Sequence, residues 1–203
     1  GPPDRDDLAR QAASRFARGD APDVSSAIRA VGEEHSVRPA ERPTPGRVRQ
    51  HLQGMSMQAM GELGYRLFVA ETLRIAEEIM TDFDEMLGVE SMLVGQEAKG
   101  LVDGDLALHL RVYTKRPLRE IVEHLVQRGY AEPSFETADT RFGRLDRARL
   151  IEDDVELVLT RCLPEMRDSA GVHLFTKKPI PTVTVGELRA QIEALEAGDG
   201  PAR

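Results

Sequence analysis

Hydrophobic periodicity changes near residue 90, and this change constrains the fold more than any other feature of the sequence. Before it, apolar residues recur every three or four positions, and "YRLFVAETLRIAEEIMTDF" (65–83) is typical of a helix with one wide apolar face. After it, "DLALHLRVYT" (105–114) alternates, which predicts a strand with one apolar face. The chain therefore has to pack helices against a sheet.

Two helices are expected near the N-terminal end. The first, over 3–20, has acidic residues in its first turn and stops at Gly19. The second, over 23–35, begins at Asp23, a residue type that favours helix N-caps. The segment 36–46 is rich in proline, has few apolar residues and is the best linker candidate.

These patterns predict two domains. A helical N-terminal appendage with its proline-rich linker occupies 3–44, and an α+β domain occupies 45–198. The second domain begins with a helical stretch that Gly54, Gly61 and Gly64 are expected to bend or break, because glycine inside a helix costs about 1 kcal/mol relative to alanine.

The rest of the second domain mixes helix and strand patterns. After the alternating strand we expect a helix at 117–130, strands at 134–142, 147–162 (two, with a turn between them) and 171–179, and a helix at 184–198. The last helix has a capping box, with Thr184 as the cap and Glu187 three residues on. The expected fold class is α+β: a small mixed β-sheet with helices packed on it, preceded by an α-helical N-terminal region.

Composition narrows the environment in which the chain works. With one cysteine, Cys162, the sequence has no internal disulfide framework and no multi-cysteine zinc site. Cys162 follows an apolar run, so we expect a buried, inert thiol, and a reducing cytoplasm as the location. No apolar run approaches the roughly 18–20 residues of a membrane span, so no membrane partner is expected.

The net charge of −8 argues against broad binding to nucleic acid or to anionic membranes. A local basic stripe remains an exception that the overall charge does not exclude. Tryptophan is absent and aromatic residues make up 4% of the chain, so stacking surfaces for single-stranded nucleic acid are few.

The acidic turn "LVDGDL" (101–106) has two interpretations. Asp-Gly between apolar residues is a strong signal for a tight hairpin. Alternatively, Asp103 and Asp105, two positions apart at the start of a strand, point to the same side and can share a divalent metal. A third carboxylate, Glu156, lies in a strand-like run that could pair nearby.

The stretch "LVGQEAKGLVDGDLALHL" (93–110) is similar to the signature of the nucleotidyltransferase superfamily with the polymerase-beta-like fold. In that superfamily a strand ends in Gly-Ser or Gly-Gly, a short turn follows, an Asp-x-Asp pair opens the next strand, and a later strand supplies a third carboxylate. The element order over roughly 8–197 resembles small bacterial nucleotidyltransferase-like proteins. The resemblance implies the same α+β fold.

The resemblance also implies site residues. The turn "GQEAKG" would cradle the triphosphate through Gly95, Gln96 and Gly100. The acids Asp103, Asp105 and Glu156 would hold Mg²⁺, and Glu156 would help to activate the attacking hydroxyl.

The chain departs from the family pattern at four points. Gln96 stands where the family has Ser or Gly, Gly104 separates the two acids, and Glu156 replaces the usual Asp. The spacing between the glycine turn and the acid pair is also short. Whether the chain is an enzyme is therefore left open, because members of such groups have often lost catalytic acids.

Two basic loops resemble each other, "HLRVYTKRPL" (109–118) and "HLFTKKPI" (173–180). One interpretation is a pair of anion-binding loops. The first would lie at a helix N-terminus, where Lys115, Arg116 and Arg119 add positive charge for binding phosphate. The other is that each strand simply ends in a solvated basic tip, with proline stopping the ladder.

Two functions follow from these patterns. The first is a Mg²⁺-dependent nucleotidyltransferase that moves a nucleoside monophosphate from a nucleoside triphosphate (NTP) to a hydroxyl. The second is a non-catalytic regulatory or partner-binding protein on the same fold, with a nucleotide, a protein or a second copy of the chain as its partner. The N-terminal helices or the methionine-rich region around Met55, Met57 and Met60 would then supply the contact surface, unless those methionines fill core gaps.

Overall fold

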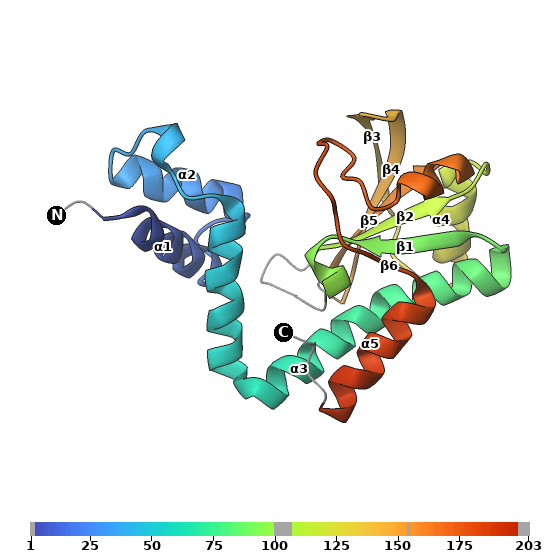
Figure 1. Ribbon diagram of the computed structural model, residues 1–203, viewed down its shortest axis with the longest axis horizontal. Coiled ribbons are helices and arrows are strands. Elements are labelled where there is room, and N and C mark those ends of the chain that lie inside the picture. Colours follow the sequence, from blue (N-terminus) through green and yellow to red (C-terminus); the bar gives the residue numbers. More distant parts are fainter. Residues whose placement is uncertain (1–2, 100–106, 154, 199–203) are drawn as a thin grey trace. The chain divides into compact units, whose positions relative to one another are not determined.

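The computed structural model describes residues 3–99, 107–153 and 155–198 (Figure 1). These residues form two compact units, one up to Tyr65 and one from Arg66 onward. The domain boundary predicted after residue 44 stays a prediction. The elements, in chain order, are α1 (Arg5–Ala17), α2 (Val24–Glu34), the 3-10 turn η1 (Pro39–Glu41), α3 (Pro45–Leu87), β1 (Glu90–Val94), η2 (Gln96–Lys99), β2 (Ala107–Tyr113), α4 (Leu118–Gln127), β3 (Ser134–Thr140), β4 (Gly143–Glu152), β5 (Val155–Cys162), η3 (Pro164–Ser169), β6 (Thr182–Val183) and α5 (Val185–Ala197).

The long helix α3 is interrupted once by non-helical dihedrals, at Gly61 (φ 74°, ψ 168°). These dihedrals lie in a region that is open almost only to glycine, which explains the residue type at the break. Gly54 and Gly64, also expected to disturb the helix, are accommodated within it. Among the described residues, no helix is both long and apolar enough to cross a membrane.

The N-terminal unit is built on capped helices. Asp4 caps α1 and Asp23 caps α2, each accepting a hydrogen bond from a backbone N–H three residues on, so the predicted cap at Asp23 is confirmed. The first turns of α3 complete the core through Val48 and Leu52. Met55 packs against this core, whereas Met57 and Met60 are exposed.

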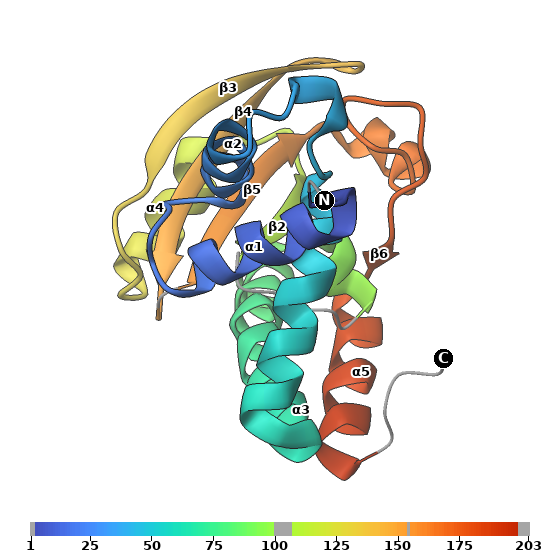
Figure 2. The same cartoon turned by 90° about the vertical axis from the view of Figure 1, so that its left-hand side faces the viewer.

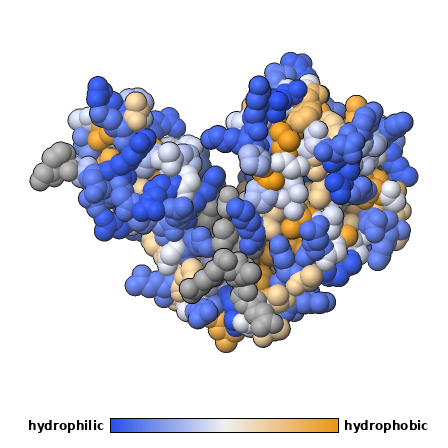
Figure 3. All heavy atoms as spheres, in the orientation of Figure 1, coloured by the Kyte–Doolittle hydropathy of each residue, from blue (hydrophilic) through white to orange (hydrophobic). Residues whose placement is uncertain are grey.

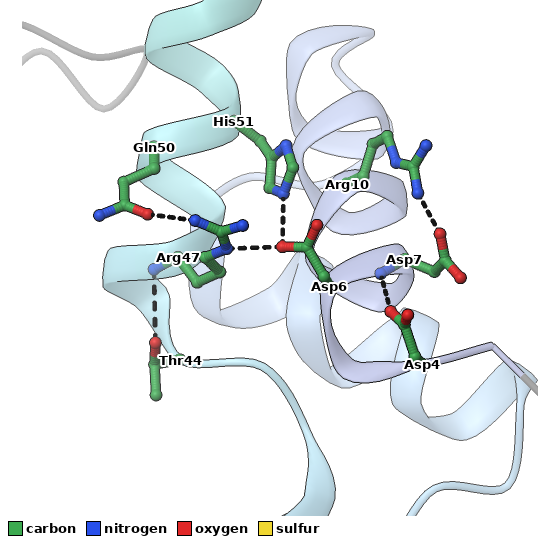
Figure 4. Close-up of polar contacts among 8 residues, drawn as sticks. All are labelled: Asp4, Asp6, Asp7, Arg10, Thr44, Arg47, Gln50 and His51. Carbon is green, nitrogen blue, oxygen red and sulfur yellow. Dashed lines mark hydrogen bonds and ion pairs between the residues drawn. The ribbon is translucent and has the colours of Figure 1, made fainter.

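A carboxylate ties α1 to α3 in this unit (Figure 4). The Asp6 Oδ1 atom lies 2.5 Å from Arg47 Nε and 3.0 Å from His51 Nε2. These hydrogen bonds, that of Arg47 first, lower the pKa of Asp6 from 3.8 to about 2.

The C-terminal unit is a six-stranded mixed sheet in the order β3-β4-β5-β2-β1-β6. The central strands β2 and β5 are parallel, and the other neighbours are antiparallel. Leu108 and Leu110 of β2 and Leu157 and Leu159 of β5 lie on one face and are fully buried. The predicted α+β class with a mixed sheet and a helical N-terminal region is confirmed.

Polar contacts join the three helices of this unit into one layer. His124 of α4 is 2.6 Å from Asp82 of α3, and Arg189 of α5 is 2.9 Å from Glu77 of α3. In Figure 2, α4 lies on the opposite side of the sheet from the segment 163–181. The two faces of the sheet are therefore covered by different kinds of structure.

The predicted strand at 171–179 is wrong. Only an isolated bridge, Val172 with Pro179, forms there. The backbone N–H of His173 donates to Lys178 O at 2.9 Å and closes a loop. The alternating residues of "GVHLFT" therefore lie in a closed loop and do not add a strand to the sheet.

The capping box of α5 gives a stability prediction. Thr184 accepts from the Glu187 N–H at 3.3 Å, and Glu187 accepts from the Thr184 N–H at 3.2 Å. We expect Thr184→Ala to lower the free energy of unfolding by about 1 kcal/mol, because the backbone N–H of Glu187 loses its side-chain acceptor and the capping box is broken. Thr184→Ser keeps the cap and should retain most of this stability in urea titrations; equal losses in both variants would contradict the assignment.

A pH prediction follows from Asp6. Since its folded pKa is lowered, its carboxylate stabilises the fold fully above the unfolded pKa near 3.8, and this stabilisation disappears as the pH falls toward about 2. We expect the wild type to exceed Asp6→Asn in thermal stability above about pH 5, with a difference that vanishes near pH 2. Circular dichroism melts of both proteins across this range measure it, and a pH-independent difference would show that the charge is not involved.

Candidate functional site

The sheet face turned away from α4 carries polar side chains in register. Val158 of β5 pairs with His109 of β2 on one side and with Arg149 of β4 on the other. One step along, Thr160 pairs with Arg111 of β2 and Arg147 of β4. Because cross-strand partners point to the same side of a sheet, these residues share one face.

The segment 163–181 covers half of this polar face. Arg111 is 3% exposed and donates to the carbonyl oxygens of Ala170 and Val172, each at 2.9 Å. An apolar cluster packs beside it, formed by Cys162 with Met92, Val94, Tyr113, Leu145, Ala170 and Leu174. A buried cation and an apolar cluster thus hold the segment on the sheet.

Cys162 is completely buried in this cluster, as predicted. Burial raises the pKa of its thiol to about 11, so the group stays protonated and unreactive at neutral pH.

The other half of the face, near the start of β5, contains an arginine between two carboxylates. Arg149 Nε lies 2.8 Å from Glu136 of β3, and its Nη1 pairs with Glu156 of β5. The side chains of Arg149 and Glu156 are 38% and 39% exposed. Although burial alone would lower the pKa of Arg149, its hydrogen bonds to Glu136 and Glu156 raise it.

Arg147 lies between the covered and open halves. Its Nε donates to Thr160 Oγ1 at 3.1 Å, and its guanidinium carbon lies 5.5 Å from the centroid of the Phe175 ring. Arg147 also forms a salt bridge with Glu136, in which Arg147 Nη1 lies 3.9 Å from Glu136 Oε1. Burial lowers the pKa of Arg147, although the group remains a cation at neutral pH.

The structure brings two of the predicted site regions to the start of β2. Val94 of β1 pairs with His109, so Gly95 and Gln96 follow at that end, and Glu156 of β5 pairs with Ala107. Gly100, Asp103 and Asp105 lie outside the described residues, so their predicted roles stay predictions. Among the described residues, no three His, Cys, Asp or Glu side chains are grouped to hold a metal ion.

The glycine turn has a defined geometry at Gly95. Its φ of 99° favours glycine, and its N–H donates to Pro181 O at 2.9 Å. That N–H is therefore already used, so a phosphate at this turn would need donors from later residues.

The hairpin interpretation of Asp103 and Gly104 falls outside the described residues, so it stays a prediction. In the described part, β1 and β2 pair with Val94 opposite His109.

The predicted phosphate-binding cations lie at the opposite end of β2. Lys115, Arg116 and Arg119 follow the strand, whose seven residues span roughly 20 Å. The backbone carbonyls of Lys115 and Arg116 accept hydrogen bonds from Arg161, and Arg119 stacks on Phe135 at 4.9 Å. One phosphate group cannot contact both these cations and the Gly95 turn.

Sequence reasoning missed Arg147, Arg149 and Glu136. The available signal was the spacing of the two arginines, two apart in "RLDRARLIE", which places both on one face of an expected strand. Which strand would face them depended on the strand order, which the sequence does not reveal.

Comparisons with known proteins assign no family. No protein-family model matches the chain, and no curated protein matches it. Among solved structures, a complex of a CCA-adding enzyme with CTP is similar to it at 10% identity and a TM-score of 0.33, over 62% of this chain and 35% of that one. The chain spans about a third of that protein's length, and a TM-score this low carries no argument about fold or function.

The buried Arg111 gives a prediction for the covered half of the face. Arg111→Ala leaves two loop carbonyls without their donor, and we expect it to lower the free energy of unfolding by about 2–4 kcal/mol. Arg144→Ala, which removes an arginine side chain that is 69% exposed, should change it by less than about 0.5 kcal/mol. Urea unfolding measures the free energy of unfolding of both variants. Faster proteolysis within 163–181 in Arg111→Ala alone would show that this segment has lost its attachment to the sheet. Equal effects of the two substitutions would contradict the role of Arg111 as the anchor of the segment.

Proposed function

We propose that this chain is a nucleotidyltransferase-like protein that binds a nucleotide or another phosphate-bearing ligand with Mg²⁺ at the start of β2 and β5. The observation that supports it best is the parallel pairing of these strands, with Glu156 opposite Ala107. Ala107 lies two positions after Asp105, so the strand expected to supply the third carboxylate is the neighbour of the strand that follows the acid pair.

The donor chemistry of the three acids suits the ion. Mg²⁺ prefers hard oxygen ligands and is commonly held by one or two carboxylates together with substrate phosphates. Asp103, Asp105 and Glu156 would hold the ion together if all three carboxylates came within reach of one position. The turn that begins at Gly95 is on the other side of β2, where the triphosphate would lie.

In an active enzyme the reaction is an in-line displacement at the α-phosphorus. A bond forms from the acceptor hydroxyl oxygen to phosphorus, the bond to the bridging oxygen breaks, and pyrophosphate leaves. Glu156 takes the proton of the attacking hydroxyl. Bound Mg²⁺ would supply charge stabilisation for the phosphates.

A second function, a non-catalytic regulatory or partner-binding protein on the same fold, has an observation in its favour. Glu156 is paired with Arg149, which also binds Glu136. A guanidinium at the third-acid position competes with a metal cation for the same oxygens. A protein that lost its chemistry would retain such a pair as a structural contact.

Calorimetry with each NTP, with and without Mg²⁺, tests the main proposal. We expect Mg²⁺-dependent binding of at least one NTP, weakened more than about tenfold (about 1.4 kcal/mol) in Asp103→Asn/Asp105→Asn, because both metal-binding carboxylates are lost. Asp146→Asn, an exposed carboxylate on the other face of β4, is the matched control and should bind like wild type. Absence of binding to every nucleotide would refute the proposal.

Pyrophosphate release separates the two functions. With a panel of hydroxyl-bearing acceptors, an active enzyme should release pyrophosphate, and Glu156→Gln should abolish release. If NTP binds without any release, and Arg149→Gln strengthens Mg²⁺ binding by freeing Glu156, the non-catalytic function is favoured.

A further inference from the structure

The second basic loop, 173–178, is fixed on the turn between β3 and β4. The His173 N–H donates to Lys178 O at 2.9 Å, which closes the loop on itself. The Arg141 N–H donates to Leu174 O at 2.9 Å, and Arg141 Nη1 donates to Thr176 O at 3.2 Å. Leu174 is buried, so the loop has an anchored base and an exposed tip.

The tip presents one aromatic ring among cations. Phe175 is 47% exposed. Also exposed are Lys177 and Lys178 of the same loop and Arg141, which binds the backbone of the loop. We name these residues, together with Arg147, the basic-aromatic patch. In Figure 3, hydrophilic and hydrophobic residues are interspersed on this side of the unit and do not gather into one hydrophobic patch.

The ring of Phe175 is held in place from the sheet side. Arg147 lies 5.5 Å from its centroid, and Arg147 is itself fixed by Thr160 at 3.1 Å. The His173 ring lies 5.8 Å from the Phe175 ring. Because the Phe175 ring is exposed and is held in position by a cation, a second planar group can stack on it.

The local charge is opposite in sign to that of the chain. The patch contains cations, whereas the net charge of the whole chain is −8. Arg144 and Asp139 pair with each other at 3.0 Å on the other face of the same hairpin, so they do not neutralise the patch. Within the patch, Arg147 pairs with Glu136 at 3.9 Å. Among the described residues, no salt bridge involves Lys177, Lys178 or Arg141, so a bound anion would face these three cations.

We propose that the basic-aromatic patch binds single-stranded nucleic acid, with a base stacked on Phe175 and adjacent phosphates on Lys177, Lys178 and Arg141. Proteins commonly bind single-stranded nucleic acid with aromatic rings combined with lysine and arginine. Every base has a face that can stack on a ring, and every phosphodiester group carries a negative charge. An acidic peptide would use the cations but would leave the ring without a function. The surface is separate from the proposed nucleotide site and does not depend on it.

Fluorescence anisotropy with a short labelled oligodeoxythymidylate, and with the corresponding oligouridylate, tests this without Mg²⁺ or nucleotide. At about 50 mM salt the wild type should bind, and its affinity should fall toward about 200 mM as counterions are released. Phe175→Ala should weaken binding by about 5- to 150-fold with an unchanged salt slope. Lys177→Gln/Lys178→Gln should reduce the salt slope by about 1.4, since two phosphate contacts are lost.

The chain offers matched controls on the other face of the same hairpin. Phe135 is 44% exposed and has Arg119 over its ring, so Phe135→Ala removes a comparable ring elsewhere. Arg144→Gln removes a comparable charge. Both should bind like wild type, as should Asp103→Asn/Asp105→Asn, which keeps this test independent of the nucleotide site.

Three outcomes would overturn the proposal. They are no binding of either oligonucleotide at about 50 mM salt, equal losses in Phe175→Ala and Phe135→Ala, and tight binding of a polyglutamate peptide that Phe175→Ala leaves unchanged. The last result would assign the patch to acidic protein segments. Circular dichroism of each variant checks that the fold is retained.

Discussion

The parallel pairing of β2 with β5 is the constraint on which the C-terminal unit depends. Parallel neighbours cannot be joined by a tight turn, so the chain must travel back along the sheet before β5 begins. It does so through α4 and the β3–β4 hairpin, which place a helix on one face and add two strands to the edge. The leucines of β2 and β5 are then buried beneath the helical layer, and the alternate residues form the polar face.

The two halves of the polar face differ in the groups that compensate their arginine charges. Arg111 gives its hydrogen bonds to two backbone carbonyls and is covered, which fixes the segment 163–181. Arg149 is compensated by two carboxylates and stays partly accessible. Since a buried charge needs hydrogen bonds whereas an accessible one can exchange partners, only the second arrangement suits a site that binds and releases ions.

Three groups of predicted functional residues are separated along the unit. The Gly95 turn and Glu156 lie at the start of β2, and Lys115, Arg116 and Arg119 lie beyond its end. The loop that carries Phe175 rests on β4 through Arg147. The two basic loops, alike in sequence, therefore lie in different surroundings. One leads into the N-terminus of α4, and the other is anchored on the β3–β4 hairpin.

The sequence by itself determined the local structure. Capping at Asp23 and Thr184, alternation in β2 and the turn between β4 and β5 depend on hydrogen bonds and periodicities within a few residues, so short windows predicted them. Only the tertiary structure decided the strand order, the pairing of Arg149 with Glu156 across β4 and β5, and the fate of "GVHLFTKKP" as a loop. These depend on partners far apart in the chain, such as Arg111 with Ala170 and Val172, and no local pattern specifies which distant group will satisfy a donor.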